Sequence, residues 1–199
     1  MGGIKRFLNS PYTFWALLAL PSIGMLSSFV GGSASPHRLL HPTGEFAARF
    51  MILAMMITPL RMLFANHRWP LWLQRRRRYI GVAAFCYALL HTYFYVLDLG
   101  SLSAVMSDAL KLSIWTGWIA FLVFVPLALT SNDWAVRKLK RAWKPLQRWV
   151  YVAAVFTLGH WIFLEYELGA ALVHFLPLLA LEAYRIMRNN QPTKTLAEA

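Results

Sequence analysis

The stretch Arg76-Arg77-Arg78-Tyr79-Ile80-Gly81, which runs on to Ala88-Leu89-Leu90-His91, decides the fold of this chain. An arginine cluster is followed by about three apolar helical turns and then by a single histidine. A charge-free apolar run of this kind predicts a membrane-spanning helix, in which an ionisable side chain indicates a functional site. We therefore expect a transmembrane helix that carries His91 inside the membrane.

A second segment has the same arrangement. Gln147-Arg148-Trp149 leads through an apolar run to His160. Each histidine lies about thirteen residues beyond the basic end of its helix, which is roughly 20 Å at 1.5 Å per residue. If both helices run in the same direction, the two histidines lie at one depth and can hold one ligand between them.

The composition excludes an ordinary soluble domain. The chain has 199 residues, of which 58% are hydrophobic and 14% are charged, and its mean hydropathy is +0.47. The net charge of +12 comes from basic residues that cluster between apolar runs, where they set membrane topology, so nucleic-acid binding is not expected. The single cysteine, Cys86, excludes an intramolecular disulfide and a zinc or iron–sulfur site built from cysteines.

The apolar runs predict an all-α integral membrane protein: one transmembrane domain over residues 1–199 that forms a bundle of six transmembrane helices. The first run follows Lys5 and Arg6 and precedes Ser33-Ala34-Ser35, a pattern that also opens a signal peptide, but the run is longer than a signal-peptide core and we expect it to remain as a span. Residues 65–78 are predicted to form a basic loop. The six predicted spans are 11–30, 45–64, 78–97, 112–129, 146–164 and 169–185.

Lysine and arginine alternate between the loops. The N-terminus, the second and fourth loops and the C-terminal tail are basic, whereas the first, third and fifth loops hold only Arg38 and Lys111. An acidic turn with Glu165 and Glu167 forms the fifth loop. The positive-inside rule then places both termini in the cytoplasm and puts His91 and His160 in the outer half of the bilayer.

Paired histidines at one depth suit haem. A neutral imidazole is the commonest metal ligand, and two facing imidazoles are a standard way to hold haem iron in a bundle core. The alternative is that each histidine only forms a hydrogen bond between helices. The aromatic residues near the two histidines in sequence are the candidate walls of a haem slot: Phe85, Tyr87, Tyr93, Phe94, Phe156, Trp161 and Phe163.

Three further polar residues have more than one interpretation. His174, near the outer end of the last span, is a third ligand, a partner for a haem propionate or an interfacial residue. His41 in the first loop is a second candidate for a propionate contact. Arg61 near the cytoplasmic end of its span either extends its side chain to the interface or binds an anionic cofactor group.

The chain resembles the MsrQ (YedZ) family, the haem-binding membrane subunit of the bacterial periplasmic methionine-sulfoxide reductase system, which belongs to the wider ferric-reductase-like transmembrane group. The resemblance covers residues 35–188. It rests on several short motifs in matching order, which are His41-Pro-Thr-Gly44, Ile57-Thr-Pro-Leu-Arg61, Arg78-Tyr-Ile-Gly81 leading to Leu90-His91-Thr92, Leu127-Ala-Leu-Thr-Ser131, and Trp149-Val-Tyr151 leading to Gly159-His160.

The resemblance implies a six-helix b-type cytochrome in the bacterial inner membrane, with His91 and His160 as ligands of the haem iron. Such a subunit takes electrons from the quinone pool and passes them to a periplasmic molybdopterin-containing catalytic subunit, and the family is also associated with FMN. The chain has no Gly-rich dinucleotide fingerprint, so we expect an electron-transfer subunit rather than a complete enzyme.

One position departs from the family pattern. Family members usually carry a further histidine where this chain has Gln147, and the counterpart on the third span is Arg78, so a second haem is not expected. The residues on this side, Arg61, Arg77, Arg78, Gln147 and Arg148, have two interpretations: the arginines only set the membrane topology, or the group binds an anionic cofactor such as FMN, or a quinone. The alternatives are a free-standing ferric or other transmembrane reductase and a non-redox membrane scaffold.

Overall fold

The computed structural model describes residues 10–165 and 168–191, and every regular element within them is helical. The predicted basic residues Lys5 and Arg6, and Glu167 of the last turn, lie outside the described residues. Five helices are long and apolar enough to cross a membrane, so the chain is a multi-pass membrane protein. The elements are α2 (Pro11–Val30), α3 (Pro36–Leu63), α4 (Arg68–Leu99), α5 (Leu102–Asp108), α6 (Leu112–Leu129), α7 (Asp133–Leu139), η1 (Lys140–Ala142), α8 (Trp143–Arg148), α9 (Val150–Glu165) and α10 (Leu168–Asn189).

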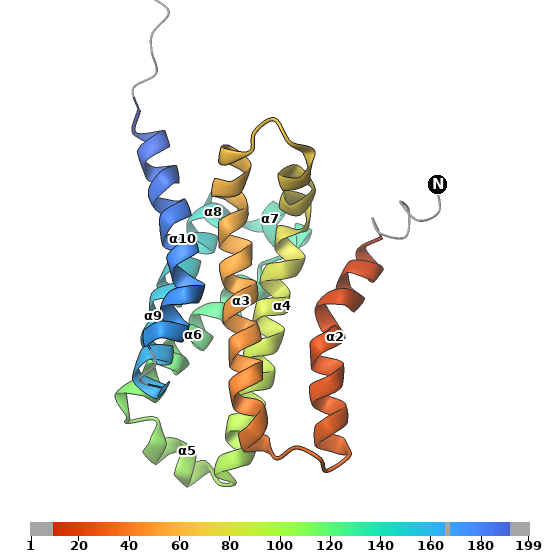
Figure 1. Cartoon of the computed structure of the whole chain (residues 1–199), viewed down its shortest axis with the longest axis vertical. Coiled ribbons are helices and arrows are strands. Elements are labelled where there is room, and N and C mark those ends of the chain that lie inside the picture. Colours follow the sequence, from red (N-terminus) through yellow and green to blue (C-terminus); the bar gives the residue numbers. More distant parts are fainter. Residues whose placement is uncertain (1–9, 166–167, 192–199) are drawn as a thin grey trace, which may run out of the picture.

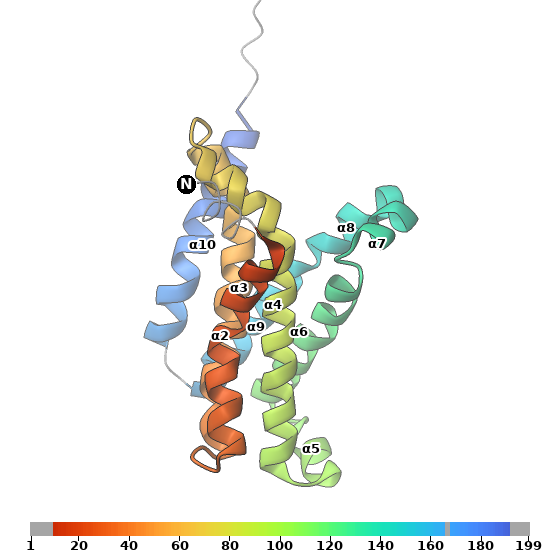
Figure 2. The same ribbon diagram turned by 90° about the vertical axis from the view of Figure 1, so that its right-hand side faces the viewer.

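Two antiparallel helix pairs form the body of the bundle. Helices α3 and α4 pack along most of their length, and α6 packs in the same way against α9. Helix α10 covers α3, and α2 lies at the edge of the bundle beside α4 (Figures 1 and 2). Helix α2 begins and α10 ends at the same end of the bundle (Figure 1). The functional site lies between the two helix pairs.

The second and third predicted spans are longer than expected. Helix α3 begins at Pro36 rather than near residue 45, because Ser35 caps it by accepting a hydrogen bond from the Arg38 amide and a proline fits the first helical position. Helix α4 begins at Arg68 and includes most of the predicted basic loop 65–78. Arginine is a good helix former. The buried Arg76 also packs over the ring of Trp72 at 3.9 Å, which stabilises this first part of α4.

The fifth predicted span is interrupted. The chain turns at Trp149, so residues 146–164 contribute to two helices, α8 and α9. Helix α9 has 16 residues and is shorter than the five candidate spans. The loops that the sequence predicted at residues 98–111 and 130–145 hold the short helices α5 and α7 with η1 and the first part of α8.

The hydrophobic core of the bundle extends to the wall of the histidine cavity, where Ala48, Phe124 and Trp161 belong to both. Met51 and Met55 of α3 are almost completely buried, and they pack with Ala153 and Ala154 of α9. Helix α2 is held separately by the Tyr87 hydroxyl, which donates to the Leu18 carbonyl and accepts from the Ser22 amide.

Candidate haem site

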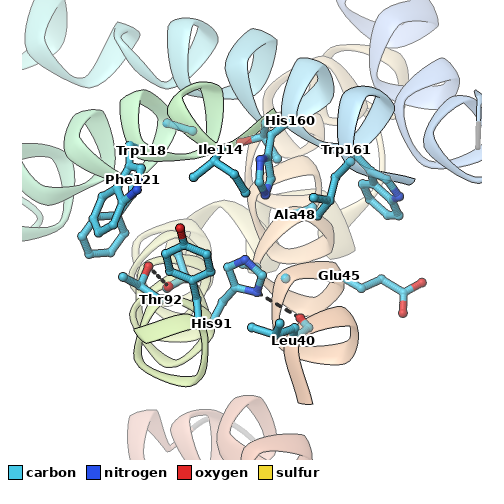
Figure 3. A pocket seen from close by; sticks show the side chains of 18 of the residues that line it. Leu40, Glu45, Ala48, His91, Thr92, Ile114, Trp118, Phe121, His160 and Trp161 are labelled. Carbon is cyan, nitrogen blue, oxygen red and sulfur yellow. Dashed lines mark hydrogen bonds between the residues drawn. The ribbon is translucent and has the colours of Figure 1, made fainter. Parts of the chain in front are cut away.

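His91 and His160 face each other between the two helix pairs. Their helices, α4 and α9, run in the same direction (Figure 1). The centroids of the two rings are 6.2 Å apart and the ring planes are inclined by 79°. Figure 3 shows the two rings entering one space from opposite sides. We call the half of the bundle that holds this pair the histidine end.

The space between the helix pairs is a cavity of about 380 Å³. This is within the size range of small-molecule and cofactor sites. Its walls come from α3, α4, α6 and α9, and they are mainly apolar. Small residues on the facing helices keep the backbones accessible and leave room for a flat group; they are Gly44, Ala47, Ala48, Ala88, Gly117 and Ala120.

The separation of the two rings fits an iron ion between them. A bond from a metal to an imidazole nitrogen is about 2 Å, and roughly 1 Å more leads to the centre of the ring, so two axial ligands require centroids about 6 Å apart. The observed value is 6.2 Å. The pair is therefore placed to bind one iron from both sides.

Two histidines alone do not complete an iron site. Within residues 10–165 and 168–191, no group of three or more His, Cys, Asp or Glu side chains is placed to hold a metal ion. The remaining ligands of an iron between His91 and His160 must then come from its own cofactor. A haem would supply these ligands itself, and the mainly apolar lining of the cavity fits such a group.

Backbone carbonyls fix the protonation of both rings. The Nδ1 atom of His91 lies 2.9 Å from the carbonyl oxygen of Leu40, and Nδ1 of His160 contacts the carbonyl oxygen of Ser113. A carbonyl oxygen only accepts, so each Nδ1 carries the hydrogen and donates it. Each neutral ring then has its lone pair on Nε2, which is the form that ligates a metal.

Most of the predicted slot residues do not line the cavity. Of the seven aromatic residues, only Trp161 is a lining residue. Tyr87 and Phe94 are buried but contact α2, and the side chains of Tyr93 and Phe163 are exposed. The prediction was wrong because sequence neighbours of a histidine occupy all faces of its helix.

The actual lining follows helical spacing. For each histidine, the residues three before, one after and four after face the cavity. This rule would have found Tyr95 and Leu164 from the sequence. Helix α6 carries no histidine, so its contribution had no signal in the sequence. Besides the two histidines, the lining residues from these three helices are Ala88, Thr92 and Tyr95 on α4, Thr157, Trp161 and Leu164 on α9, and Ile114, Gly117, Trp118, Ala120, Phe121 and Phe124 on α6.

His174 does not enter the cavity. Its Nδ1 donates to the carbonyl of Ala170 at 2.8 Å, and its Nε2 accepts from Nε of Arg49 at 3.1 Å, so both ring nitrogens have partners. Its ring packs on Trp161 with centroids 5.1 Å apart. Of the three interpretations of His174, the third-ligand one is not supported by this arrangement. His174 instead supports a wall of the cavity from behind.

Polar residues surround one rim of the cavity. Glu45 of α3 lies 3.8 Å from His41 and 3.8 Å from His174, and it also forms an ion pair with Arg49. His41 and Glu45 belong to the cavity lining, so the predicted propionate contact, His41, does lie at the edge of the site.

A second polar group lies where α4 meets α5. The Tyr95 hydroxyl donates to Asp108 at 3.0 Å, and Lys111 lies 2.5 Å from the other oxygen of the same carboxylate. The hydrogen bond from Lys111, together with the one from Tyr95, lowers the pKa of the Asp108 carboxyl against the opposing effect of burial. Tyr95 thus connects the cavity wall to a charged pair at the surface.

The residues predicted to bind FMN or quinone lie at the opposite end, which we call the arginine end and define by Arg61, Arg77, Arg78, Gln147 and Arg148. Arg77 donates to the carbonyl of Ala54 at 2.8 Å, Arg78 to Asp133 at 2.6 Å, and Arg61 to Gln74 at 2.5 Å. The arginines with described partners therefore bind different groups. None of the five residues lines the cavity.

Gln147, which replaces the further histidine of the family pattern, is bound to α6. Its Nε2 donates to the carbonyl of Leu127 at 3.1 Å and to the Thr130 hydroxyl at 3.0 Å. An amide in this position has no nitrogen lone pair to offer a metal. The side chain connects α8 to the end of α6.

The comparisons with known proteins agree with this geometry. The family described as "Ferric reductase like transmembrane component" matches residues 43–158, more than half of the chain. This range includes His91 and ends just before His160. No solved structure gives a significant match.

Two curated bacterial proteins are similar to the chain, and both are named "Protein-methionine-sulfoxide reductase heme-binding subunit MsrQ". The protein from Brucella anthropi is 38% identical over 161 residues, which are 76% of this chain and 71% of the relative. The protein from Brucella ovis is 42% identical over 125 residues, 61% of this chain. That alignment spans about half of the relative, 54% of its length.

Proposed function

Because the chain belongs to the MsrQ family within the ferric-reductase-like transmembrane group, we propose that it is a b-type cytochrome that transfers electrons to a methionine-sulfoxide reductase. The observation that carries the proposal is the pair His91 and His160, 6.2 Å apart across an apolar cavity. The names of the relatives support a haem-binding subunit that works with a catalytic partner.

Each part of the histidine end has a role in this proposal. His91 and His160 would hold the iron through Nε2, while their Nδ1 atoms donate to the Leu40 and Ser113 carbonyls. The apolar walls exclude water, and the polar rim with His41 accommodates the charged edge of the macrocycle. A bound haem supplies one-electron redox chemistry. One haem per chain is expected, because Gln147 cannot serve as a second axial ligand.

The proposed electron path runs from the quinone pool to a periplasmic molybdopterin-containing subunit, which reduces methionine sulfoxide in oxidised proteins. The membrane is the bacterial inner membrane. Basic residues concentrate at the arginine end, which supports a cytoplasmic location for that end and for both termini. The histidine end then faces the periplasm and the catalytic partner.

Labelling of single cysteines tests this orientation. In a Cys86→Ala background, a membrane-impermeant thiol reagent added from outside is expected to label Ser103→Cys, near α5, and not Leu139→Cys, at the end of α7. The opposite pattern would invert the bundle and direct the histidine end to the cytoplasm.

The arginine end is proposed to hold an anionic cofactor such as the phosphate of FMN. The support is its fixed positive charge: Arg61 and Arg148 lie at the ends of α3 and α8, and Arg77 and Arg78 lie in the first half of α4. Arg77 is turned inward to the Ala54 carbonyl and the Thr58 hydroxyl, so Arg61, Arg78 and Arg148 are better placed for an external group.

The visible spectrum of the purified protein tests the proposal. We expect a reducible Soret band of a low-spin haem, with a pyridine haemochrome assay giving one haem b per chain. His91→Ala and His160→Ala should each remove the low-spin signal, whereas His174→Ala should keep most of it. Full haem retention in both single variants would reject the ligand assignment.

The same experiment separates the alternatives. A protein without a haem band is a scaffold whose histidines only connect helices. The ferric-reductase family match favours a second candidate, a free-standing reductase of ferric complexes or other small substrates. That candidate predicts rapid oxidation of the reduced haem by a ferric chelate without a protein partner, whereas the proposed function predicts oxidation by the methionine-sulfoxide reductase subunit.

A further inference from the structure

The same dipeptide stands opposite each histidine. Thr43-Gly44 of α3 faces His91, and Thr116-Gly117 of α6 faces His160. The two dipeptides belong to the two different helix pairs, α3 with α4 and α6 with α9. The same local arrangement, a Thr-Gly dipeptide facing a histidine, therefore occurs twice at the histidine end, although α3 and α6 have little else in common in sequence.

The glycines allow the imidazoles to lie directly on the neighbouring backbone. A Cβ atom added at Gly44 would lie 3.0 Å from Nδ1 of His91, and one at Gly117 would lie 2.8 Å from Nδ1 of His160. Contacts this short would force the ring to move. Each ring therefore occupies the volume that a side chain would take at the glycine.

Because each imidazole ring packs against the glycine, its Nδ1 atom reaches one backbone carbonyl of the same helix. The acceptors for Nδ1 are Leu40 and Ser113, and each lies four residues before the glycine of its helix. In an α-helix this carbonyl accepts the amide hydrogen of the glycine itself. The histidine thus adds a second donor to a carbonyl that is already part of the helical ladder.

The threonines add a third donor to the same carbonyls. The Thr116 hydroxyl lies 2.8 Å from the Ser113 carbonyl oxygen and 3.0 Å from that of Leu112, and the Thr43 hydroxyl lies 3.0 Å from the Leu40 carbonyl oxygen and 2.6 Å from that of Leu39. Each hydroxyl hydrogen is thus shared between the carbonyl that binds the histidine and the carbonyl one residue before it. Both threonines are completely or almost completely buried. Each axial histidine thus shares its backbone acceptor with one buried hydroxyl group.

We propose that the two Thr-Gly pairs are positioning residues that set the orientation of the axial histidines and the redox potential of the iron between them. The inference rests on the proposed haem ligation and adds the groups that control it. The glycine determines where the ring lies. The threonine determines how strongly the Nδ1 hydrogen is bound.

The direction of the effect follows from the shared acceptor. A carbonyl oxygen has two lone pairs, and three donors compete for them. Removal of the hydroxyl strengthens the bond from Nδ1 and makes the imidazole a stronger electron donor. A stronger donor stabilises ferric over ferrous iron, so the reduction potential falls.

Substitution of the threonines tests the electronic part. Thr43→Val and Thr116→Val should keep the haem, lower the midpoint potential and shift the g-values of the ferric haem in electron paramagnetic resonance; the double variant should shift further than either single one. Thr130→Val is the matched control, because its hydroxyl likewise donates to a carbonyl of α6, that of Pro126, which binds neither histidine, and Thr130 does not line the cavity. The control should keep the wild-type potential.

Substitution of the glycines tests the steric part. Gly44→Ala and Gly117→Ala should weaken haem binding about tenfold or more, or convert the spectrum from low-spin to high-spin. Gly159→Ala is the control: it adjoins His160, but its new Cβ would meet only Phe163, at an ordinary 3.7 Å. If the glycine variants fail to fold, the threonine variants decide the question alone.

The outcomes separate this inference from the proposed function. Wild-type protein that binds haem through His91 and His160, but whose threonine variants keep the wild-type potential and g-values, would overturn the inference and leave the proposed function intact. Glycine variants with the haem affinity and spectrum of Gly159→Ala would overturn the steric part. Wild-type protein without haem would reject the proposed function itself.

Discussion

At both the histidine end and the arginine end, a side chain donates a hydrogen bond to a backbone carbonyl of helix α6, but only the histidine end has a cavity. His160 donates to the Ser113 carbonyl near the beginning of α6, and Gln147, thirteen residues earlier, donates to the Leu127 carbonyl near its end. The imidazole of His160 lines the cavity and has a second ring nitrogen, whereas the Gln147 amide uses its only nitrogen on α6. The difference between the two side chains thus separates a candidate ligand from a structural connection.

The facing helix shows the same contrast. On α4, His91 faces an apolar cavity, whereas Arg77 donates to the Ala54 carbonyl and the Thr58 hydroxyl of α3. Arg77 differs from His91 because its guanidinium group lies inside a membrane bundle and needs several hydrogen-bond acceptors. It finds these acceptors on the adjacent helix α3. The comparison teaches that two side chains facing each other at one depth do not by themselves make a cofactor site. A cofactor site also needs an open cavity between them and a nitrogen that carries no hydrogen.

Exchange of the two side chains gives the largest expected effect. His160→Gln should abolish the low-spin haem, because the amide nitrogen has no lone pair for iron. Gln147→His should not create a second haem, since Arg77 and Arg78 stand where an opposite ligand would be needed. Haem content per chain, measured by pyridine haemochrome, should fall from one to about zero in the first variant and stay at one in the second.

The second variant also has an informative contrary result. Two haems per chain in Gln147→His would show that the arginine end can open to the size of a cofactor, and that only the missing histidine keeps it empty of iron. A partial haem loss in His160→Gln, without a change of spin state, would show that His91 alone defines the site.

Electron entry at the arginine end gives a smaller effect. Arg61→Ala combined with Arg78→Ala should slow haem reduction by the physiological donor several-fold or more, because both cations face away from the core and suit an anionic cofactor. The haem spectrum and reduction by dithionite should not change. Stopped-flow reduction measures the difference, and unaltered donor kinetics would reject a cofactor site at this end.

The pairing of His91 and His160 could be predicted from the sequence, because its signal is the spacing along the chain alone; their role as haem ligands stays a prediction. Equal spacing from a basic helix end to a lone histidine occurs in two segments, and it requires no knowledge of neighbours. The cavity walls could not be predicted in this way. Their large aromatic residues Trp118, Phe121 and Phe124 come from α6, which has no chemical feature in its sequence to relate it to the histidines. The Thr-Gly pairs acquire meaning only when a histidine from another helix is beside them.

The helical class and the approximate spans were predictable from hydropathy, whereas the helix boundaries were not. Arginine-rich residues 68–78 were assigned to a loop because charge marks the end of a membrane span. Charge does not end a helix, and α4 continues through this region to Leu99. At the beginning of α3, the N-cap formed by Ser35 extends the helix back to Pro36. Local hydrogen bonds decide such boundaries, and hydropathy does not report them.

Removal of the Gln147 contacts should cost a small amount of stability. Gln147→Leu loses two hydrogen bonds to α6, each worth about 0.6 kcal/mol inside a membrane protein, so we expect a loss of about 1 kcal/mol. The haem spectrum should stay unchanged. Unfolding in mixed micelles measures the loss, with Gln74→Leu as a control at the exposed contact with Arg61. A shifted haem spectrum would show that the two ends are coupled through α6.

The smallest expected effect concerns the ion pair between Arg78 and Asp133. The hydrogen bond from Arg78 and the positive charge of Arg78 lower the pKa of the Asp133 carboxyl. A carboxyl whose pKa is lower in the folded state stabilises the fold above the pKa of the unfolded chain, about 4, and loses this contribution as the pH falls through the folded value. The pair is largely exposed, so the contribution is small even at neutral pH.

A double-mutant cycle with Asp133→Asn and Arg78→Gln isolates this pair from the other effects of each substitution. The coupling between the two sites, measured from melting temperatures, should be stabilising and constant between pH 6 and pH 8, and it should disappear towards about pH 3, where the carboxyl is protonated. High salt should reduce it at neutral pH, because exposed charges are screened. A coupling that persists in acid would mean that α7 is held against α4 by contacts other than this ion pair, and the arginine end would then keep its shape when Arg78 turns to an anionic ligand.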